Sequence, residues 1–333
     1  MKKSLLALAV LGAFAGVAQA QSAVTVYGVV DLGLSKTNKG GITSLVNGDN
    51  SRLGFKGSED LGGGLSANFQ YEMRFDADTG VTEGNGTRPL LQGRSWVGLA
   101  GGFGSLRLGR DLTALQGSTA AFDPWGATRG RGAFSPFMLG SYGSDPLNPA
   151  NATQNRFSNA VFYSSPAMGG FQANLSVATK EGGTTAITAP NTPISLSGTY
   201  ANGPIAAVAA YERNAVDAKM WALGGSYNLG PAKLMATYAN TDASTTAGLP
   251  AGTPVGADGK VWTLGATANL GTGKVLAGYG QQRPDAAGAI NTKRFALGYE
   301  HPLSKRTYLY TDIINQKAAA STTTFDIGLH HNF

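Results

Sequence analysis

The sequence predicts an all-β fold: a closed antiparallel barrel of 16 strands that spans a membrane. Three observations predict it: an export segment at the N-terminus, segments in which apolar and polar residues alternate, and connections that are alternately short and long. Successive side chains on a strand point to opposite faces, so alternation gives a strand one apolar and one polar face. A barrel with lipid outside and water inside needs strands of this kind.

The first 20 residues have the features of a signal peptide. Two lysines follow Met1, residues 5–17 form a short apolar stretch, and Ala18-Gln19-Ala20 is an A-x-A cleavage pattern. The apolar stretch is too short for a membrane-spanning helix with a stop-transfer signal, which needs about 18 or more apolar residues. We therefore expect residues 1–20 to be removed and residues 21–333 to form one barrel domain.

The composition argues against several other classes of protein. Glycine accounts for 48 residues, charged residues for only 14%, and the mean hydropathy is −0.09. The chain has no cysteine, so neither a disulfide framework nor a thiolate metal site is available. Two of the 26 basic residues lie in the signal segment, which leaves 24 against 20 acidic residues. This excess is small and is not gathered in a basic helix, so nucleic-acid binding is not expected.

Alternation is clearest in residues 65–76, where odd positions are apolar or aromatic and even positions are polar or charged. The same pattern occurs in 171–177, 262–268, 294–300 and 325–333. Tilted strands of about 10 residues are long enough to cross a bilayer. No segment of comparable length has the i, i+3, i+4 apolar spacing of an amphipathic helix.

The connections between these segments alternate in length. Seven are short and turn-like: 58–64, 101–104, 166–170, 202–204, 230–231, 271–273 and 302–304. Eight are longer, polar and rich in glycine: 36–50, 77–89, 110–154, 181–192, 214–218, 242–259, 284–291 and 316–322. Fifteen connections imply 16 strands, and short periplasmic turns with longer external loops are typical of transmembrane barrels. A secreted β-sandwich, whose two ends face the same solvent, does not explain this alternation.

The connection at residues 110–154 is far longer than the others. Loops of more than about 15 residues are uncommon in compact folds and are usually functional or disordered. Its large aromatic residues include Phe122, Trp125, Phe134 and Phe137. Such side chains must pack somewhere, and the only shelter that a barrel offers is its own lumen. We therefore expect this loop to fold inward.

Four motifs carry a resemblance to a known family. They are residues 24–31 (VTVYGVVD), 51–65 (SRLGFKGSEDLGGGL), 96–110 (WVGL and FGSLRLGR), and the C-terminal strand ending in Phe333. The chain resembles the general porins of beta-proteobacterial outer membranes over its whole mature length.

The resemblance implies a passive, water-filled channel for ions and small hydrophilic solutes in the bacterial outer membrane. It also implies a homotrimer of multi-pass barrels in contact with outer-membrane lipid and lipopolysaccharide. The loop at 110–154 would form the constriction, and Phe333 would belong to the signal read by the barrel-assembly machinery.

The resemblance further implies that basic residues on the wall face acidic or carbonyl groups of the inserted loop. Arg52 matches one such wall position, and alternation directs Arg52, Lys56 and Arg74 into the lumen. The expected constriction comprises these wall residues and four loop charges: Asp111, Asp123, Arg129 and Arg131. Whether each loop charge lines the pore or braces the loop through ion pairs stays open.

Two positions complicate this expectation. Phe162 lies where many relatives have a basic or polar wall residue, which argues against a dense arginine cluster and against strong anion selectivity. The direction of Arg94 stays open, because both alternating sets around residues 96–99 are apolar. The preference for anions or cations therefore also stays open.

Other activities find little support. His330 and His331 are neighbours on an expected strand and point to opposite faces, so they cannot share one metal ion. The GTGK sequence at 271–274 lacks the Ser or Thr of a phosphate loop and is interpreted as a hairpin turn. We expect no catalysis, metal or cofactor. A substrate-specific channel for a sugar or organic acid remains an alternative, although Tyr27 and Phe162 form no regular aromatic series. An adhesin or structural barrel that its third loop closes is another.

Overall fold

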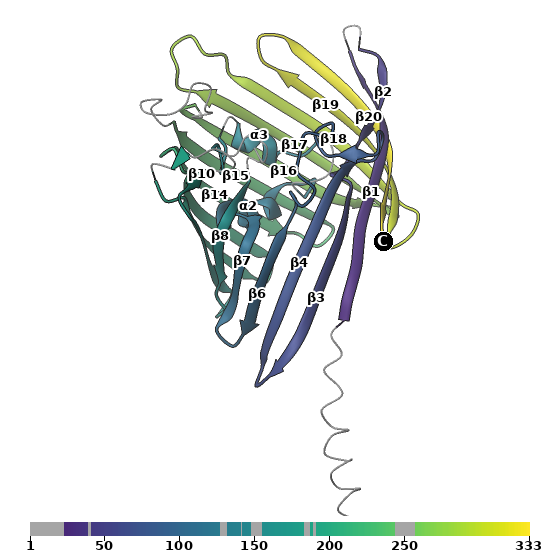
Figure 1. The fold of residues 1–333 in the computed structure, drawn as a ribbon. Helices are drawn as coiled ribbons and strands as arrows, with labels where there is room; N and C mark the ends of the chain where they lie inside the picture. Colours follow the sequence, from purple (N-terminus) through teal and green to yellow (C-terminus); the bar gives the residue numbers. More distant parts are fainter. Residues whose placement is uncertain are drawn as a thin grey trace, which may run out of the picture.

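The computed structural model describes residues 23–38, 41–126, 132–140, 142–147, 155–182, 187–188, 191–243 and 257–333. Over these residues the chain forms a closed antiparallel barrel of 16 long strands with short helical segments in its interior (Figure 1). The fold class predicted from alternation and from the count of connections is confirmed. Within the same residues, no helix is both long and apolar enough to span a membrane.

The barrel wall consists of the long strands in chain order. These are β1 (Ala23–Thr37), β3 (Arg52–Gly62), β4 (Leu65–Asp76), β6 (Ser95–Gly101), β7 (Gly104–Leu112), β8 (Arg156–Ser164), β9 (Phe171–Ala178), β12 (Ile194–Asn202), β13 (Ile205–Arg213), β14 (Lys219–Asn228), β15 (Ala232–Asp242), β16 (Gly259–Leu270), β17 (Gly273–Pro284), β18 (Thr292–Pro302), β19 (Thr307–Lys317) and β20 (Ser321–Asn332). The connections hold the short elements β2 (Thr43–Asn47), β5 (Val81–Thr82), α2 (Ala114–Thr119), η1 (Ala120–Phe122), α3 (Ser135–Leu139), β10 (Glu181–Gly182) and β11 (Ile187–Thr188).

The first and last strands close the barrel. β20 pairs antiparallel with β1, from Val29↔Asn332 to Thr37↔Thr324. The pairing continues at the C-terminus, where the N–H of Phe333 donates to the carbonyl of Gly28 at 3.1 Å and the Gly28 N–H donates back at 3.0 Å. Closure leaves none of the described wall strands with an unpaired edge, which is the condition for a sheet inside a bilayer.

The two faces of the wall follow the predicted alternation. In β4, Tyr71 faces outward and is 40% exposed, whereas the neighbouring Glu72 faces inward and is 5% exposed. Large apolar side chains such as Leu264, Phe295 and Ile327 are exposed on the outer face. Because lipid is the solvent for that face, their exposure to the surroundings is favourable rather than costly.

The predicted short turns lie at one end of the barrel and most of the long connections at the other (Figure 1). One expected long connection is shorter than predicted. Residues 316–322 were expected to form a loop, but β19 continues to Lys317 and β20 begins at Ser321. Lys317 pairs with Ser321 in the ladder, so only residues 318–320 form the turn. The run of Ser and Thr after 320 suits a strand because Thr is β-branched.

The described part of the long loop lies against the inner wall. Leu115, Phe122, Trp125, Phe134 and Phe137 are all buried. They share one apolar cluster with inward residues of the second half of the barrel: Val208, Ala210, Met220, Ala222, Ala239, Val261, Leu276, Ala296 and Ile314. Figure 1 shows α2 and α3 within the ring of strands. The apolar core of this protein therefore lies inside the barrel, between loop and wall.

Candidate pore constriction

A cavity of about 980 Å³ lies between the loop and the first strands of the wall. Five arginines and two glutamates line it: Arg52, Arg74, Arg88, Arg94, Arg156, Glu72 and Glu83. The described loop residues on its other side carry no charge; they include Gln116, Gly117, Ser135 and Leu139. The side chains of the lining thus carry five positive and two negative formal charges, and none of these charges comes from the described part of the long loop.

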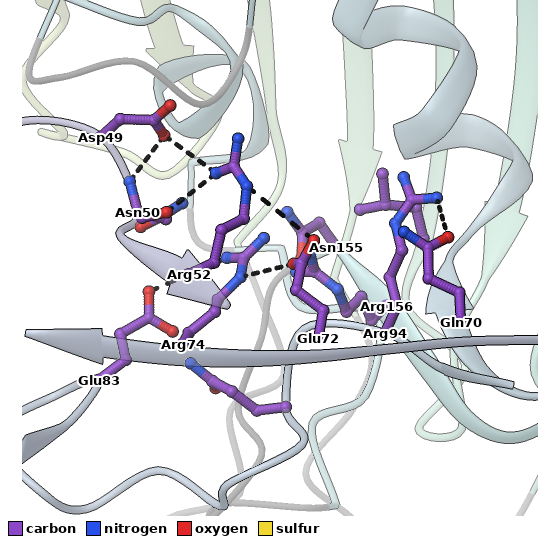
Figure 2. Close-up of polar contacts among 12 residues, drawn as sticks. Asp49, Asn50, Arg52, Gln70, Glu72, Arg74, Glu83, Arg94, Asn155 and Arg156 are labelled. Atoms are coloured by element: carbon purple, nitrogen blue, oxygen red, sulfur yellow. Dashed lines mark hydrogen bonds and ion pairs between the residues drawn. The ribbon is translucent and has the colours of Figure 1, made fainter. Parts of the chain in front are cut away.

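Glu72 lies between two of these arginines (Figure 2). Its Oε1 accepts a hydrogen bond from Arg74 Nε at 3.2 Å, and its Oε2 lies 3.9 Å from Arg52 Nε. β3 and β4 bring the three together because Arg52 pairs directly with Arg74 and Gly54 with Glu72. Two like charges on opposed positions repel each other. The carboxylate of Glu72 offsets that repulsion and fixes both guanidinium groups.

The remaining contacts of Arg52 and Arg74 also hold their side chains in place. Arg52 Nη1 donates to the carbonyl of Asn50 at 2.9 Å and lies 3.5 Å from Asp49 Oδ1. Arg74 Nη1 lies 3.9 Å from Glu83 Oε1. Both arginines are therefore anchored by the connections that follow β1 and β4. An arginine held in this way presents a fixed positive charge rather than a mobile one.

Arg94 is the most exposed of the ion-paired arginines of this wall, with 32% of its side chain accessible. Its Nε lies 3.4 Å from Asp111 Oδ1, and its Nη1 donates to Gln70 Oε1 at 3.4 Å. The inward direction that the sequence left open is therefore settled. Asp111 is itself 1% exposed and also pairs with Arg107. Asp111 therefore forms ion pairs with Arg94 and Arg107 and is not among the residues that line the cavity.

Arg110 is buried outside the cavity lining, whereas Arg156 belongs to the lining although its side chain is almost wholly buried. Arg110 donates to the Gln92 carbonyl at 3.0 Å and to Ser158 Oγ at 2.6 Å. Arg156 is 3% exposed, and its Nη1 donates to Asn155 Oδ1 at 2.7 Å. Figure 2 shows Arg156 beside Glu72 and Arg94. The wall therefore contains more positive charge than its surface alone presents.

The start of the loop is attached to the wall by side-chain caps. The first N–H groups of a helix lack partners within the helix. In α2 the N–H of Ala114 donates to Ser176 Oγ at 3.0 Å, and that of Leu115 donates to Ser195 Oγ at 2.9 Å. Thr113 caps the same turn by accepting from Gln116 N–H at 3.3 Å. Serines of β9 and β12 thereby hold α2 in a defined place.

The middle of the loop is attached to the opposite side of the barrel. Trp125 Nε1 donates to Asp312 Oδ1 on β19 at 2.9 Å, and Gln282 on β17 donates to the carbonyl of Phe137. The Phe134 ring contacts Trp125 at a tilt and Phe137 edge to face, with centroids 6.0 Å apart in both pairs. The loop thus reaches across the lumen from β9 and β12 to β19.

Asp123 acts inside the loop. Its carboxylate accepts the backbone N–H groups of Trp125, Phe134 and Ser135 at 3.0, 2.7 and 2.7 Å. Burial raises the pKa of Asp123 above its usual value, and these three hydrogen bonds oppose the rise. Asp123 therefore braces the loop, which is one of the two roles considered for the loop charges.

The remaining expected constriction residues are Lys56, Arg129 and Arg131. Lys56 faces the lumen but lines a second cavity, of about 760 Å³, with Trp96 and Arg107. Its Nζ lies 5.4 Å from the centroid of the Tyr27 ring. Arg129 and Arg131 lie outside the described residues.

The inference drawn from Phe162 is corrected. Its side chain is buried, and Arg107 lies over its ring at 5.6 Å. A dense arginine cluster nevertheless forms, because Arg88, Arg94 and Arg156 come from other elements. Their contribution could not be inferred from the motif around Phe162 alone. Glu72 was also not anticipated, although it shares the polar face of residues 65–76 with Arg74.

Comparisons with known proteins agree with this architecture. A family model described as Gram-negative porin matches residues 7–319. Outer membrane porin protein 32 of Delftia acidovorans is 36% identical over 97% of this chain and 92% of its own length. An outer membrane porin protein of Bordetella pertussis is 30% identical over the full length of both chains.

Solved structures give the same result. An anion-selective porin from Comamonas acidovorans superposes with a TM-score of 0.78 at 30% identity, covering 94% of this chain and all of the other. OmpT of Vibrio cholerae, in a trimer form, superposes with a TM-score of 0.69 at 16% identity over 94% and 99% of the two chains. At that identity the second similarity concerns the fold alone.

Proposed function

The chain belongs to the Gram-negative porin family, and from this premise we propose that its outer-membrane channel passes anions in preference to cations. The general function is that of the family: passive diffusion of ions and small hydrophilic solutes through a water-filled barrel. The preference for anions is the finer proposal, and it concerns the cavity between the arginine wall and the loop.

One observation carries the proposal: the cavity is lined by five arginines and two glutamates, opposite a described loop surface without charge. Rings of basic side chains favour anions because they lower the energy of an anion at the narrowest point and raise that of a cation. Two unit charges 4 Å apart interact by about 1 kcal/mol even in bulk water. The related porin from Comamonas acidovorans, 30% identical in sequence, is described as anion-selective.

The constriction residues proposed from the structure differ in part from those expected. We assign the charged lining to Arg52, Arg74 and Arg94, with Glu72 as the acid that orients the first two. Asp111 and Asp123 then serve to support the arginines and the loop. Lys56 acts in the second cavity instead. The substrate-specific alternative gains no support, since the lining of the main cavity shows arginines and loop residues but no aromatic track.

The assembly proposed for this chain is a homotrimer in contact with outer-membrane lipid and lipopolysaccharide. OmpT of Vibrio cholerae, which has the same fold, has been solved in a trimer form, and this supports the proposed arrangement. Phe333 is proposed as part of the signal for the assembly machinery. Its ring covers Gly28 so closely that a Cβ there would lie 2.1 Å from Phe333 Cζ.

The test of ion preference is a reversal-potential measurement on the purified, folded protein in a planar bilayer with a KCl gradient. We expect open channels and a reversal potential with the sign of chloride permeation. A reversal potential with the sign of potassium permeation would contradict the proposed preference. Failure of a folded trimer to conduct at all would contradict the channel itself.

A further inference from the structure

Four basic residues form a row on the outside of the barrel, far from the arginines of the constriction. They are Lys260 on β16, Arg283 on β17, Lys293 on β18 and Lys317 on β19, and all four are exposed. Alternation places them on the lipid face: they share the parity of the outward residues Leu264, Tyr279, Phe295 and Ile313 on the same strands. We call them the outer cation row.

The strand register brings these charges together. Lys260 lies directly opposite Arg283, and Lys293 lies directly opposite Lys317. Lys293 is also opposite Gln281, whose Oε1 accepts a hydrogen bond from Arg283 Nη2 at 3.1 Å. The row is therefore continuous across four adjacent strands. Like charges in directly opposed positions destabilise an antiparallel pair.

No acidic side chain of the described part of the chain is paired with this row, although Asp285 lies two residues after Arg283. Within the residues that the structure describes, none of its four members forms an ion pair. Two carboxylates near this end of the barrel accept local hydrogen bonds: Asp258 from the Ala243 N–H at 2.5 Å, and Asp242 from Asn240 Nδ2 at 3.1 Å. Lys219 on β14, at the same end of the barrel, differs from these four residues because its Nζ lies 3.5 Å from Asp217 Oδ2.

Neighbouring aromatic residues indicate the depth of the outer cation row in the membrane. Trp262, Tyr279 and Phe295 stand on the same face, two or four residues along their strands toward the middle of the wall, and the Trp262 and Tyr279 rings are 5.5 Å apart. Aromatic side chains gather at the boundary between hydrocarbon and headgroups. The end of the barrel is the one with the connections 243–258 and 285–291, which faces the exterior in transmembrane barrels. The cations therefore lie level with the headgroups of the outer leaflet.

We propose that the outer cation row is a docking surface for the phosphate groups of lipopolysaccharide. The proposal rests on the outer-membrane location that the family assignment gives. Phosphates supply the missing counter-charge, and the exposed Leu297 and Ile313 on the strands below offer an apolar surface for the acyl chains. A basic residue near an anionic membrane surface contributes about 1 kcal/mol, or roughly fivefold in affinity.

The test uses the folded full-length protein in detergent and measures its unfolding temperature with and without diphosphoryl lipid A. We expect lipid A to raise the unfolding temperature of the wild type. The double variant Lys293→Gln/Lys317→Gln should bind lipid A at least tenfold more weakly. Without lipid A it should unfold at the same temperature as the wild type or higher, because a repulsive pair has been removed.

The matched control is Lys305→Gln/Arg306→Gln, which removes the same charge from the turn between β18 and β19 at the opposite end of the barrel. It should bind lipid A like the wild type. Equal loss in the control and the test variant, or no loss in either, would overturn the proposal. So would an equal thermal shift with inorganic phosphate alone, or dissociation of the oligomer by the test variant, which would make the row a subunit contact.

A second measurement needs no variant. The lipid A shift of the wild type should shrink as NaCl is raised, since salt screens exposed charges. A shift that is independent of both salt and the number of lipid A phosphates overturns the proposal. A wild type that conducts ions but gains no stability from lipid A overturns it as well, and leaves the channel function intact.

Discussion

The inner wall of this barrel has two unlike halves. One half carries charged inward groups that line one cavity: Arg52 on β3, Glu72 and Arg74 on β4, Arg94 just before β6 and Arg156 at the start of β8. Along β13 to β18 the inward side chains are mostly small or apolar, and the long loop covers them. Both halves obey the same alternation on their outer face. Alternation therefore determines which residues point inward, whereas the loop determines what kind of residue is tolerated there.

The covered half is shaped to fit the loop. A Cβ at Gly278 would lie 2.3 Å from the Phe134 ring, and one at Gly265 would lie 2.5 Å from Pro124. These glycines allow the loop to approach the strand backbone directly. Dispersion contacts across such an interface are individually weak but numerous. The loop is therefore held by packing on one half of the wall, which leaves the other half free to carry charge.

Removal of the central anchor of the covered half should have the largest effect on stability and conductance. Trp125→Ala deletes a buried side chain, its ring contact with Phe134 and its hydrogen bond to Asp312. Substitutions of this kind destabilise by about 3–5 kcal/mol. We expect the loop to detach from the wall while the barrel persists, and hence a larger single-channel conductance and faster proteolysis within the loop. A conductance equal to that of the wild type would show that the loop is held by other contacts.

On the charged half of the wall, Glu72→Gln should cause the second-largest loss of stability. The substitution removes the carboxylate that holds Arg52 and Arg74, and hydrogen bonds to charged groups contribute about 1.5–3 kcal/mol. We expect a lower free energy of unfolding in urea together with stronger anion selectivity, because a negative charge leaves the lining. An unchanged free energy of unfolding would contradict the anchoring role of Glu72, and weaker anion selectivity would contradict the expected effect of removing its charge.

The smallest loss of stability is expected where α2 meets β12, at the junction of the two halves. Ser195→Ala leaves the Leu115 N–H of α2 without its partner, and loss of a helix cap costs about 1 kcal/mol. Conductance fluctuations of the open channel should increase, with little change in ion preference. Thr311→Ala on the outer face of β19 serves as a control of similar size and should leave the open-channel noise unchanged.

The sequence predicted the wall better than its charged lining. Residues 65–76 alternate without exception, so the inward direction of Arg74 followed directly. The segment 95–101 has apolar residues in both sets, and only the contacts of Arg94 with Gln70 and Asp111 settle its direction. Arg156 follows the long loop. The loop sequence does not alternate, so the direction of this side chain could not be predicted. Its position beside Glu72 depends on strands distant in sequence, and no local pattern reports such a contact.

The central claim is that the charged half of the wall sets the ion preference of the channel. Its most direct test is the reversal potential of Arg52→Gln/Arg94→Gln in a KCl gradient, compared with that of Lys274→Gln. Lys274 faces the lumen on the other half and is paired with Glu300 at 2.9 Å. The account predicts a severalfold drop in the chloride-to-potassium permeability ratio for the arginine variant and little change for the lysine variant. An unchanged ratio in the arginine variant, or an equal drop in both, would contradict it.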